Sequence, residues 1–188
     1  MRTLFVYFLI TLLFSCKSNQ SQDEDANQGL KDDFFDCLIS KLDEMPSGDS
    51  TEFFKYLKQM ENLALSENYL IEPTKIGYIN FFKELYSDNI KAETLLKKLD
   101  KQIPNFSNYG LTGVLFRNKK CLLDLIQSNP DSKFLVDRIN YFEKLEHSSF
   151  KDYDSFMSYI KLIDFKNEKD RLLLFCLLYN FMYLSTTG

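Results

Sequence analysis

Apolar residues recur at spacings of three and four along almost the whole chain, and this pattern constrains the fold more than any other feature. Such spacing places the apolar side chains on one face of a helix. Breakers are few, because the 188 residues include only 6 Gly and 4 Pro. No segment shows the sustained alternation of a strand, and no Asn-Gly or Asp-Gly hairpin turn occurs. The sequence therefore predicts an all-α fold, as a compact bundle or a short solenoid-like array of about eight helices.

Capping residues and prolines delimit the expected helices. The first helix should end before Pro46, Ser50 or Thr51 should cap the second, and Glu72-Pro73 should open the third. The expected caps further along are Asp88 or Asn89, then Asn129 with Pro130 at the first helical position, and Asn167 for the last helix. The apolar stripes run from Leu30 to Leu42, Phe53 to Ala64, Ile79 to Tyr86, Ala92 to Ile103, Val114 to Leu125, Leu135 to Leu145 and Tyr153 to Ile163.

The last expected helix differs from the others, because Leu172 to Leu184 is apolar nearly all round and is interrupted only by Asn180. A helix of this kind is buried on every side or lies in a membrane. Thirteen residues rise only about 20 Å, which is short of a bilayer's hydrocarbon core. We expect a central core helix, with a partner-binding helix as the alternative.

The N-terminus has the parts of an export signal. Arg2 precedes an apolar run of 11 residues, Leu4 to Phe14, which is shorter than the roughly 20 residues of a membrane-spanning helix. The run ends at Leu13-Phe14-Ser15-Cys16, which resembles the lipobox of bacterial lipoproteins, in the looser form of Bacteroidota-like bacteria. Leu13, Ser15 and Cys16 match that motif, and Phe14 departs from its small residue. The resemblance implies a signal peptide at 1–15, cleavage before Cys16 and acylation of Cys16.

Residues 16–29 are the expected lipidated cysteine and a polar, flexible tether, and residues 30–188 the expected helical domain. Lys17 stands where an Asp would favour the inner membrane in enteric-type lipoproteins. The resemblance thus implies a cell-envelope protein held by lipid, at the outer membrane, and leaves the periplasmic and surface leaflets open. The acidic run at 23–25 resembles a surface-export signal but lies farther from Cys16 than usual, so we interpret it as part of a solvated linker.

The net charge disfavours one class of partner. Without the signal peptide the chain carries 22 basic and 27 acidic residues, a net charge of −5. Nonspecific binding to nucleic acid requires a dense positive surface, so no nucleic-acid partner is expected.

Residues that could carry catalysis are sparse. The one histidine, His147, is expected at a helix end, where a cation suits the helix dipole. Glu143 and Glu146 flank it, and an acidic metal cluster there is the alternative to a solvated face. The cysteines occur singly, without a C-x-x-C pair, and no nucleophile or phosphate-binding motif is present. We therefore expect no enzyme, no catalytic residue, no metal and no cofactor, with an enzyme using dispersed carboxylates as the alternative.

Three cysteines remain beyond Cys16. Cys37, Cys121 and Cys176 all lie among apolar residues, which indicates buried, inert thiols. An oxidising envelope would permit one bridge, for example Cys37 to Cys176, and spacing alone leaves the pairing open.

These expectations lead to a functional hypothesis. A lipid-anchored, acidic helical domain would act by binding another protein, as an immunity protein against an antibacterial toxin or as an accessory subunit of an envelope assembly or transport complex. The expected contact residues are Phe106 and Tyr109, large rings in the irregular segment at 104–110.

Overall fold

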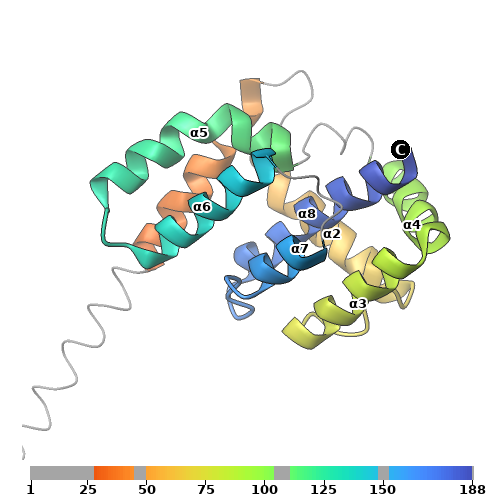
Figure 1. Ribbon diagram of the computed structural model, residues 1–188. Coiled ribbons are helices and arrows are strands. Elements are labelled where there is room, and N and C mark those ends of the chain that lie inside the picture. The colour runs from red at the N-terminus through yellow and green to blue at the C-terminus, as the bar shows by residue number, and fades with distance from the viewer. Residues whose placement is uncertain (1–27, 45–49, 104–110, 148–152, 188) are drawn as a thin grey trace, which may run out of the picture. The chain divides into compact units, whose positions relative to one another are not determined.

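The computed structural model describes residues 28–44, 50–103, 111–147 and 153–187. Within these ranges the chain forms eight α-helices and no strand, which confirms the all-α prediction (Figure 1). The first helix spans 28–39. It is followed by η1 (Leu42–Glu44), α2 (Phe53–Ser66), α3 (Lys75–Ser87), α4 (Asn89–Gln102), α5 (Leu111–Ser128), α6 (Lys133–His147), α7 (Tyr153–Ile160) and α8 (Glu168–Thr187).

The chain divides into two compact units, residues 1–36 and 37–188. In the first unit, the described residues 28–36 are helical, and the side chain of Gln28 donates to the Asp32 carboxylate one turn later, at 3.2 Å. The described residues are thus helical from 28, two residues before the expected start of the domain at 30. The predicted signal peptide, Cys16 and the tether up to residue 27 lie outside the described residues.

Helix α8 is the core of the second unit. It contacts α2, α4 and α5, which come from widely separated parts of the chain. Residues 172–179 are all buried, as are Phe181 and Met182, so the prediction of a helix buried on every side is confirmed over these residues. In a solenoid each repeat contacts only its neighbours. The contacts of α8 with distant helices instead make this unit a bundle around a central helix.

Two expected caps are confirmed. The Asp88 carboxylate accepts hydrogen bonds from the backbone N–H groups of Ile90 and Lys91, at 3.0 and 3.1 Å, and so starts α4. The side chain of Asn167 accepts from the N–H of Asp170 at 3.1 Å and starts α8. Both caps satisfy donors that an isolated helix leaves free.

Three expected helix starts were wrong. Ser50 does not cap α2, because its N–H and hydroxyl both donate to Asp43; Glu52 occupies the cap position and makes no side-chain cap bond. Thr74, and not Glu72-Pro73, caps α3 by accepting from the N–H of Gly77.

The third wrong start is that of α6. The side-chain amide of Asn129 donates to the Leu125 carbonyl at 3.0 Å, so Asn129 closes α5 and does not open the next helix. The Ser132 carbonyl accepts a hydrogen bond from the Val136 N–H, and the Ser132 hydroxyl accepts one from the Leu135 N–H. Ser132 directly precedes α6, which begins at Lys133.

Candidate functional site

The residues expected to make functional contacts fall largely outside the described structure. This applies to Phe106, Tyr109 and Cys16. His147 is the last residue of α6, the position expected for it, and Glu143 is exposed one turn earlier. Among the described residues, no three His, Cys, Asp or Glu side chains are grouped so that they could hold a metal ion. In the same ranges, no helix has both the length and the hydrophobicity needed to span a bilayer.

Helix α3 is fixed to the core by aromatic side chains. Phe82 stacks on Phe156 of α7, with ring centroids 3.6 Å apart. Tyr78 and Phe81 contact Phe175 of α8, at 5.6 and 6.2 Å. Aromatic pairs of this kind add to the free energy gained from burial alone. The inner face of α3 is therefore firmly held, and its outer face is presented on a rigid support.

The buried face of α3 is rotated from the expected one. The stripe from Ile79 to Tyr86 predicted that Tyr86 points inward, but Tyr86 is 47% exposed. Its ring lies at the edge of the core, where it contacts Phe82, Tyr153 and Phe181 with centroids 5.4 to 6.2 Å apart. Tyr86 thus has one side packed and the other open to solvent.

The segment between α2 and α3 is also tightly built. Asn68 adopts a left-handed conformation with φ of 58°, and the N–H groups of Tyr69 and Leu70 both donate to the Ala64 carbonyl. The chain then crosses the first turn of α3 so closely that a Cβ at Gly77 would lie 2.0 Å from the Glu72 carbonyl oxygen. Glycine is required at residue 77 for this close approach.

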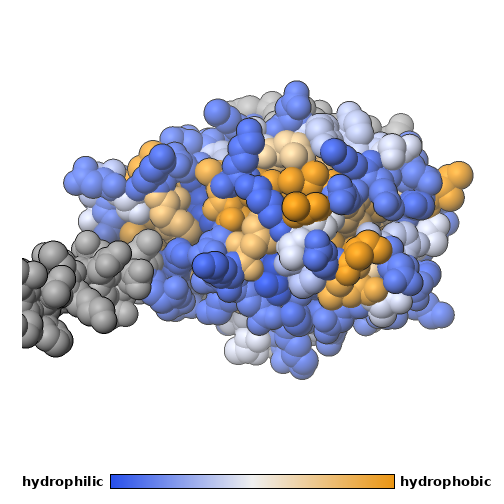
Figure 2. All heavy atoms as spheres, turned by 90° about the horizontal axis from the view of Figure 1, so that it is seen from below, coloured by the Kyte–Doolittle hydropathy of each residue, from blue (hydrophilic) through white to orange (hydrophobic). Residues whose placement is uncertain are grey.

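Around this framework, aliphatic side chains are left in solvent. Ile71 and Ile90 are each 76% exposed, and Ile76 is 67% exposed. Figure 2 shows hydrophobic residues at the surface in separate patches among hydrophilic ones, including the side where α3 and α4 lie. We call Ile71, Ile76, Tyr86 and Ile90 the α3 surface. Where exposed apolar side chains gather into a patch, they mark a contact site for another molecule.

Ion pairs flank the α3 surface. Lys98 of α4 pairs with Glu67 and lies over the Tyr69 ring at 5.9 Å, and Lys91 pairs with Glu84 across the α3–α4 turn at 3.0 Å. These pairs are exposed, so each contributes little to stability. They place charged side chains on the two helices that carry the exposed Ile76 and Ile90.

Two charged clusters lie inside the bundle. In the Glu61 cluster, the buried carboxylate of Glu61 accepts two hydrogen bonds from the Arg171 guanidinium at 2.8 and 3.2 Å, one from the Tyr78 hydroxyl at 2.8 Å and one from Lys58 at 2.8 Å. Burial alone would raise the pKa of Glu61, but these bonds outweigh it and hold the pKa below its usual value of 4.5. Burial beside the Glu61 carboxylate raises the pKa of Tyr78, so its hydroxyl remains a donor.

In the Asp170 cluster, Arg138 and Asp170 are both buried and form an ion pair at 2.5 Å. Arg138 also donates to the Leu162 carbonyl, and the N–H of Asp164 donates to the same Asp170 oxygen as Arg138 does, at 2.8 Å. The guanidinium lies over the Phe134 ring at 4.4 Å. The cluster joins α6, the α7–α8 connection and α8, and these contacts give it a structural role.

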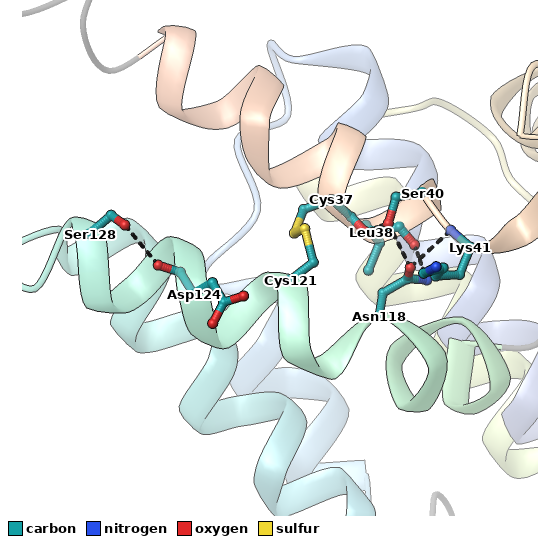
Figure 3. The surroundings of a disulfide bond; sticks show 8 residues. All are labelled: Cys37, Leu38, Ser40, Lys41, Asn118, Cys121, Asp124 and Ser128. Atoms are coloured by element: carbon teal, nitrogen blue, oxygen red, sulfur yellow. Dashed lines mark hydrogen bonds between the residues drawn. A yellow bond between two sulfur atoms is a disulfide. The ribbon is translucent and has the colours of Figure 1, made fainter.

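A disulfide joins Cys37 to Cys121, with their Cα atoms 5.7 Å apart (Figure 3). The expectation of three inert thiols was therefore wrong, and so was Cys37–Cys176 as the example of a bridge. Cys176 is a free, fully buried thiol of α8, and burial raises its pKa. The spacing of 84 residues carried no sign of this pairing, which depends on how α5 packs.

One turn before Cys121, the buried side chain of Asn118 holds the same segment. Its amide donates to the Leu38 carbonyl at 2.8 Å, and its oxygen accepts from the Lys41 N–H at 3.0 Å and the Ser40 hydroxyl at 2.9 Å (Figure 3). These bonds satisfy backbone groups at the end of the helix at 28–39. We call the disulfide and Asn118 together the α5 clasp.

Some of these residues left a signal in the sequence. Glu61 and Arg138 fall at the spacing of the buried stripes, four residues after Leu57 and three after Leu135, where a charged side chain must find a buried partner. Ile71, Ile76 and Ile90 are apolar residues that no predicted stripe included. Charged residues at a buried spacing thus indicated a buried ionic cluster, and apolar residues outside the stripes indicated an exposed apolar surface.

Comparison with known proteins places the chain in no established group: no family model, no curated protein and no solved structure matches it.

Proposed function

We propose that this protein is a membrane-anchored lipoprotein of the cell envelope that acts by binding another protein through the α3 surface. The observation that carries the proposal is the exposure of four large apolar side chains on and next to α3, the isoleucines Ile71, Ile76 and Ile90 and the half-exposed Tyr86. Two forms of the proposal follow from the sequence, an immunity protein that neutralises a toxin and an accessory subunit of an envelope assembly or transport complex.

The energetics favour binding at such a surface. Burying an isoleucine side chain is worth about 1.5–3 kcal/mol, and the α3 surface carries three of them. Binding energy concentrates in a few anchors that are already held in place, because ordering a mobile side chain on association costs free energy. Tyr86, packed on three rings, and Ile76, on the first turn of α3, meet this condition.

The envelope location is supported by two independent features. The lipobox-like residues Leu13 to Cys16 predict lipid attachment, and the Cys37–Cys121 disulfide suits a protein that matures in an oxidising compartment. Two or three acyl chains on Cys16 would give stable anchoring, where one chain is marginal.

The binding proposal can be tested with a photo-crosslinking amino acid placed at residue 76 or 90 of the full chain in its native cells. We expect one discrete adduct with a different protein from both positions. The matched control is residue 97 of α4, where Lys97 is well exposed and pairs only with Glu93 among the described residues. An adduct of equal yield from residue 97, or adducts only with lipid or a second copy, would contradict the proposal.

A second variant links the adduct to the surface. Ile90→Asp in the chain that carries the cross-linker at 76 should abolish the adduct, because a carboxylate would have to be buried in the interface. Since Ile90 is 76% exposed, the change should leave thermal unfolding unchanged. Full yield of the adduct would show that residue 90 lies outside the interface.

Membrane attachment needs its own test. Cys16→Ala should abolish labelling by a palmitate analogue and release the protein from the membrane fraction. Persistent labelling would locate the lipid elsewhere and refute the role of Cys16, while leaving the binding test unaffected.

A further inference from the structure

We propose that the Cys37–Cys121 disulfide is a reversible thiol–disulfide exchange site, in which an incoming thiolate attacks the sulfur of Cys121. The ligand is a protein dithiol, of the kind that thiol–disulfide oxidoreductases carry. This inference does not depend on the α3 surface or on the lipid anchor.

The two halves of the disulfide differ in access. Cys37 retains only 5% of its surface exposed, at the end of the helix at 28–39, whereas Cys121 is an exposed residue of α5. Exchange requires a thiolate to approach one sulfur directly and to expel the other. Access therefore directs the attack to Cys121 and makes Cys37 the leaving group.

The reaction balances without a further reagent. The first thiolate of the dithiol forms a bond to Cys121 Sγ, the Cys37–Cys121 bond breaks, and the Cys37 thiolate takes up a proton. The second thiol of the partner, as its thiolate, then attacks the partner's own sulfur in the mixed disulfide and releases Cys121 as a thiolate, which takes up a proton. The protein disulfide is reduced to two thiols and the partner dithiol is oxidised to a disulfide; the reverse sequence forms the bond again.

The contacts of Asn118 make this exchange reversible. Asn118 lies one turn from Cys121 on the same face of α5 and binds Leu38, Ser40 and Lys41 without involving either sulfur (Figure 3). When the disulfide opens, these three hydrogen bonds still hold the segment that carries Cys37 against α5. The two thiols therefore stay within reach of each other, and the free thiol of Cys176 is not drawn into a wrong pair.

The regiochemistry is tested on the full chain, purified in detergent, with a thioredoxin-type protein whose resolving cysteine is replaced by serine. This variant stops at the mixed disulfide, and peptide mass spectrometry identifies the cysteine to which it is joined. We expect the adduct at Cys121 in buffer without denaturant. An adduct at Cys37, equal adducts at both, or no adduct until denaturant is added would overturn the proposal.

A control and a second readout complete the test. Cys176→Ser should give the same adduct, because this thiol takes no part; loss of the adduct in that variant would overturn the proposed attack. After reduction and removal of the reductant, oxidation should restore Cys37–Cys121 in the parent chain and proceed several-fold more slowly in Asn118→Ala. Ser40→Ala removes the hydroxyl that donates to Asn118 and to the Cys37 carbonyl but leaves the bonds of Asn118 to Leu38 and Lys41, so it should show a smaller delay. Equal rates in all three chains would refute the holding role of Asn118.

Discussion

The Glu61 cluster and the Asp170 cluster both place a carboxylate inside the bundle next to the first turns of α8, but they satisfy it differently. Glu61 accepts hydrogen bonds from Arg171, Lys58 and Tyr78, so two cations and a hydroxyl share its charge. Among the described residues, Asp170 has Arg138 as its one cation, and its Oδ1 atom has no hydrogen-bond partner. A buried ion pair stabilises a fold only when its geometry and its remaining hydrogen bonds offset the loss of hydration. The comparison therefore indicates that the Glu61 cluster tolerates loss of one member and the Asp170 cluster does not.

The largest effect is expected from Arg138→Met. It leaves the Asp170 carboxylate buried without a cation among the described residues, which should lower the free energy of unfolding by about 3–5 kcal/mol. Arg171→Met should cost less, roughly 1.5–3 kcal/mol, because Lys58 and Tyr78 still bind Glu61. Urea unfolding of the two variants measures both losses. Equal costs, or a larger cost for Arg171→Met, would contradict the comparison.

Removing both charges of an ion pair should show a further difference in stability between the two clusters. Arg138→Met combined with Asp170→Leu should recover most of the stability lost in Arg138→Met, because replacing a whole buried pair by apolar residues is often neutral or stabilising by about 1–4 kcal/mol. Arg171→Met combined with Glu61→Leu should recover less, because it leaves the buried hydroxyl of Tyr78 without its acceptor. Recovery of equal size in both double variants would show that hydrogen-bond satisfaction does not distinguish the clusters.

The pH dependence of stability tests the Glu61 cluster alone. Because its pKa is lowered in the folded state, Glu61 contributes its full stabilisation above about pH 4.5, and this is lost as the pH falls from 4.5 through the folded pKa. Glu61→Gln cannot titrate, so the free energy of unfolding should fall less steeply with acid in this variant than in the parent. Parallel slopes below pH 4.5 would mean that Glu61 has the same pKa in the folded and unfolded chains.

Features of the fold that depend on nearby residues could be predicted from the sequence. The stripe from Ala92 to Ile103 and the caps Asp88 and Asn167 involve contacts within one or two turns, and all were confirmed. The all-round burial of α8 followed from a run of apolar residues too long for a one-sided helix.

Features that depend on packing between distant segments could not be predicted from the sequence. The pairing of Cys37 with Cys121, the bonds of Glu61 to Arg171 and the exposure of Tyr86 are set by which helices meet, and spacing along the chain does not encode this. The same holds for the α3 surface. Ile76 and Ile90 are out of phase with the buried stripes, but only the packed neighbours decide whether an out-of-phase residue is covered.

The smallest effect is expected from Lys58→Met. Lys58 is 39% exposed and bridges Glu61 and Glu168, at 2.8 and 2.6 Å, so water and salt screen much of its attraction. Pairs of this exposure contribute about 0–1 kcal/mol, and the loss should shrink further in high salt. Lys97→Met, which breaks the exposed pair with Glu93 on α4, is the matched control and should give a change of similar size. Urea unfolding at low and high salt measures both variants. If Lys58→Met costs as much as Arg171→Met, the Glu61 carboxylate depends on Lys58 as strongly as on the guanidinium. The Glu61 cluster would then not tolerate the loss of one member, and its contrast with the Asp170 cluster would fail.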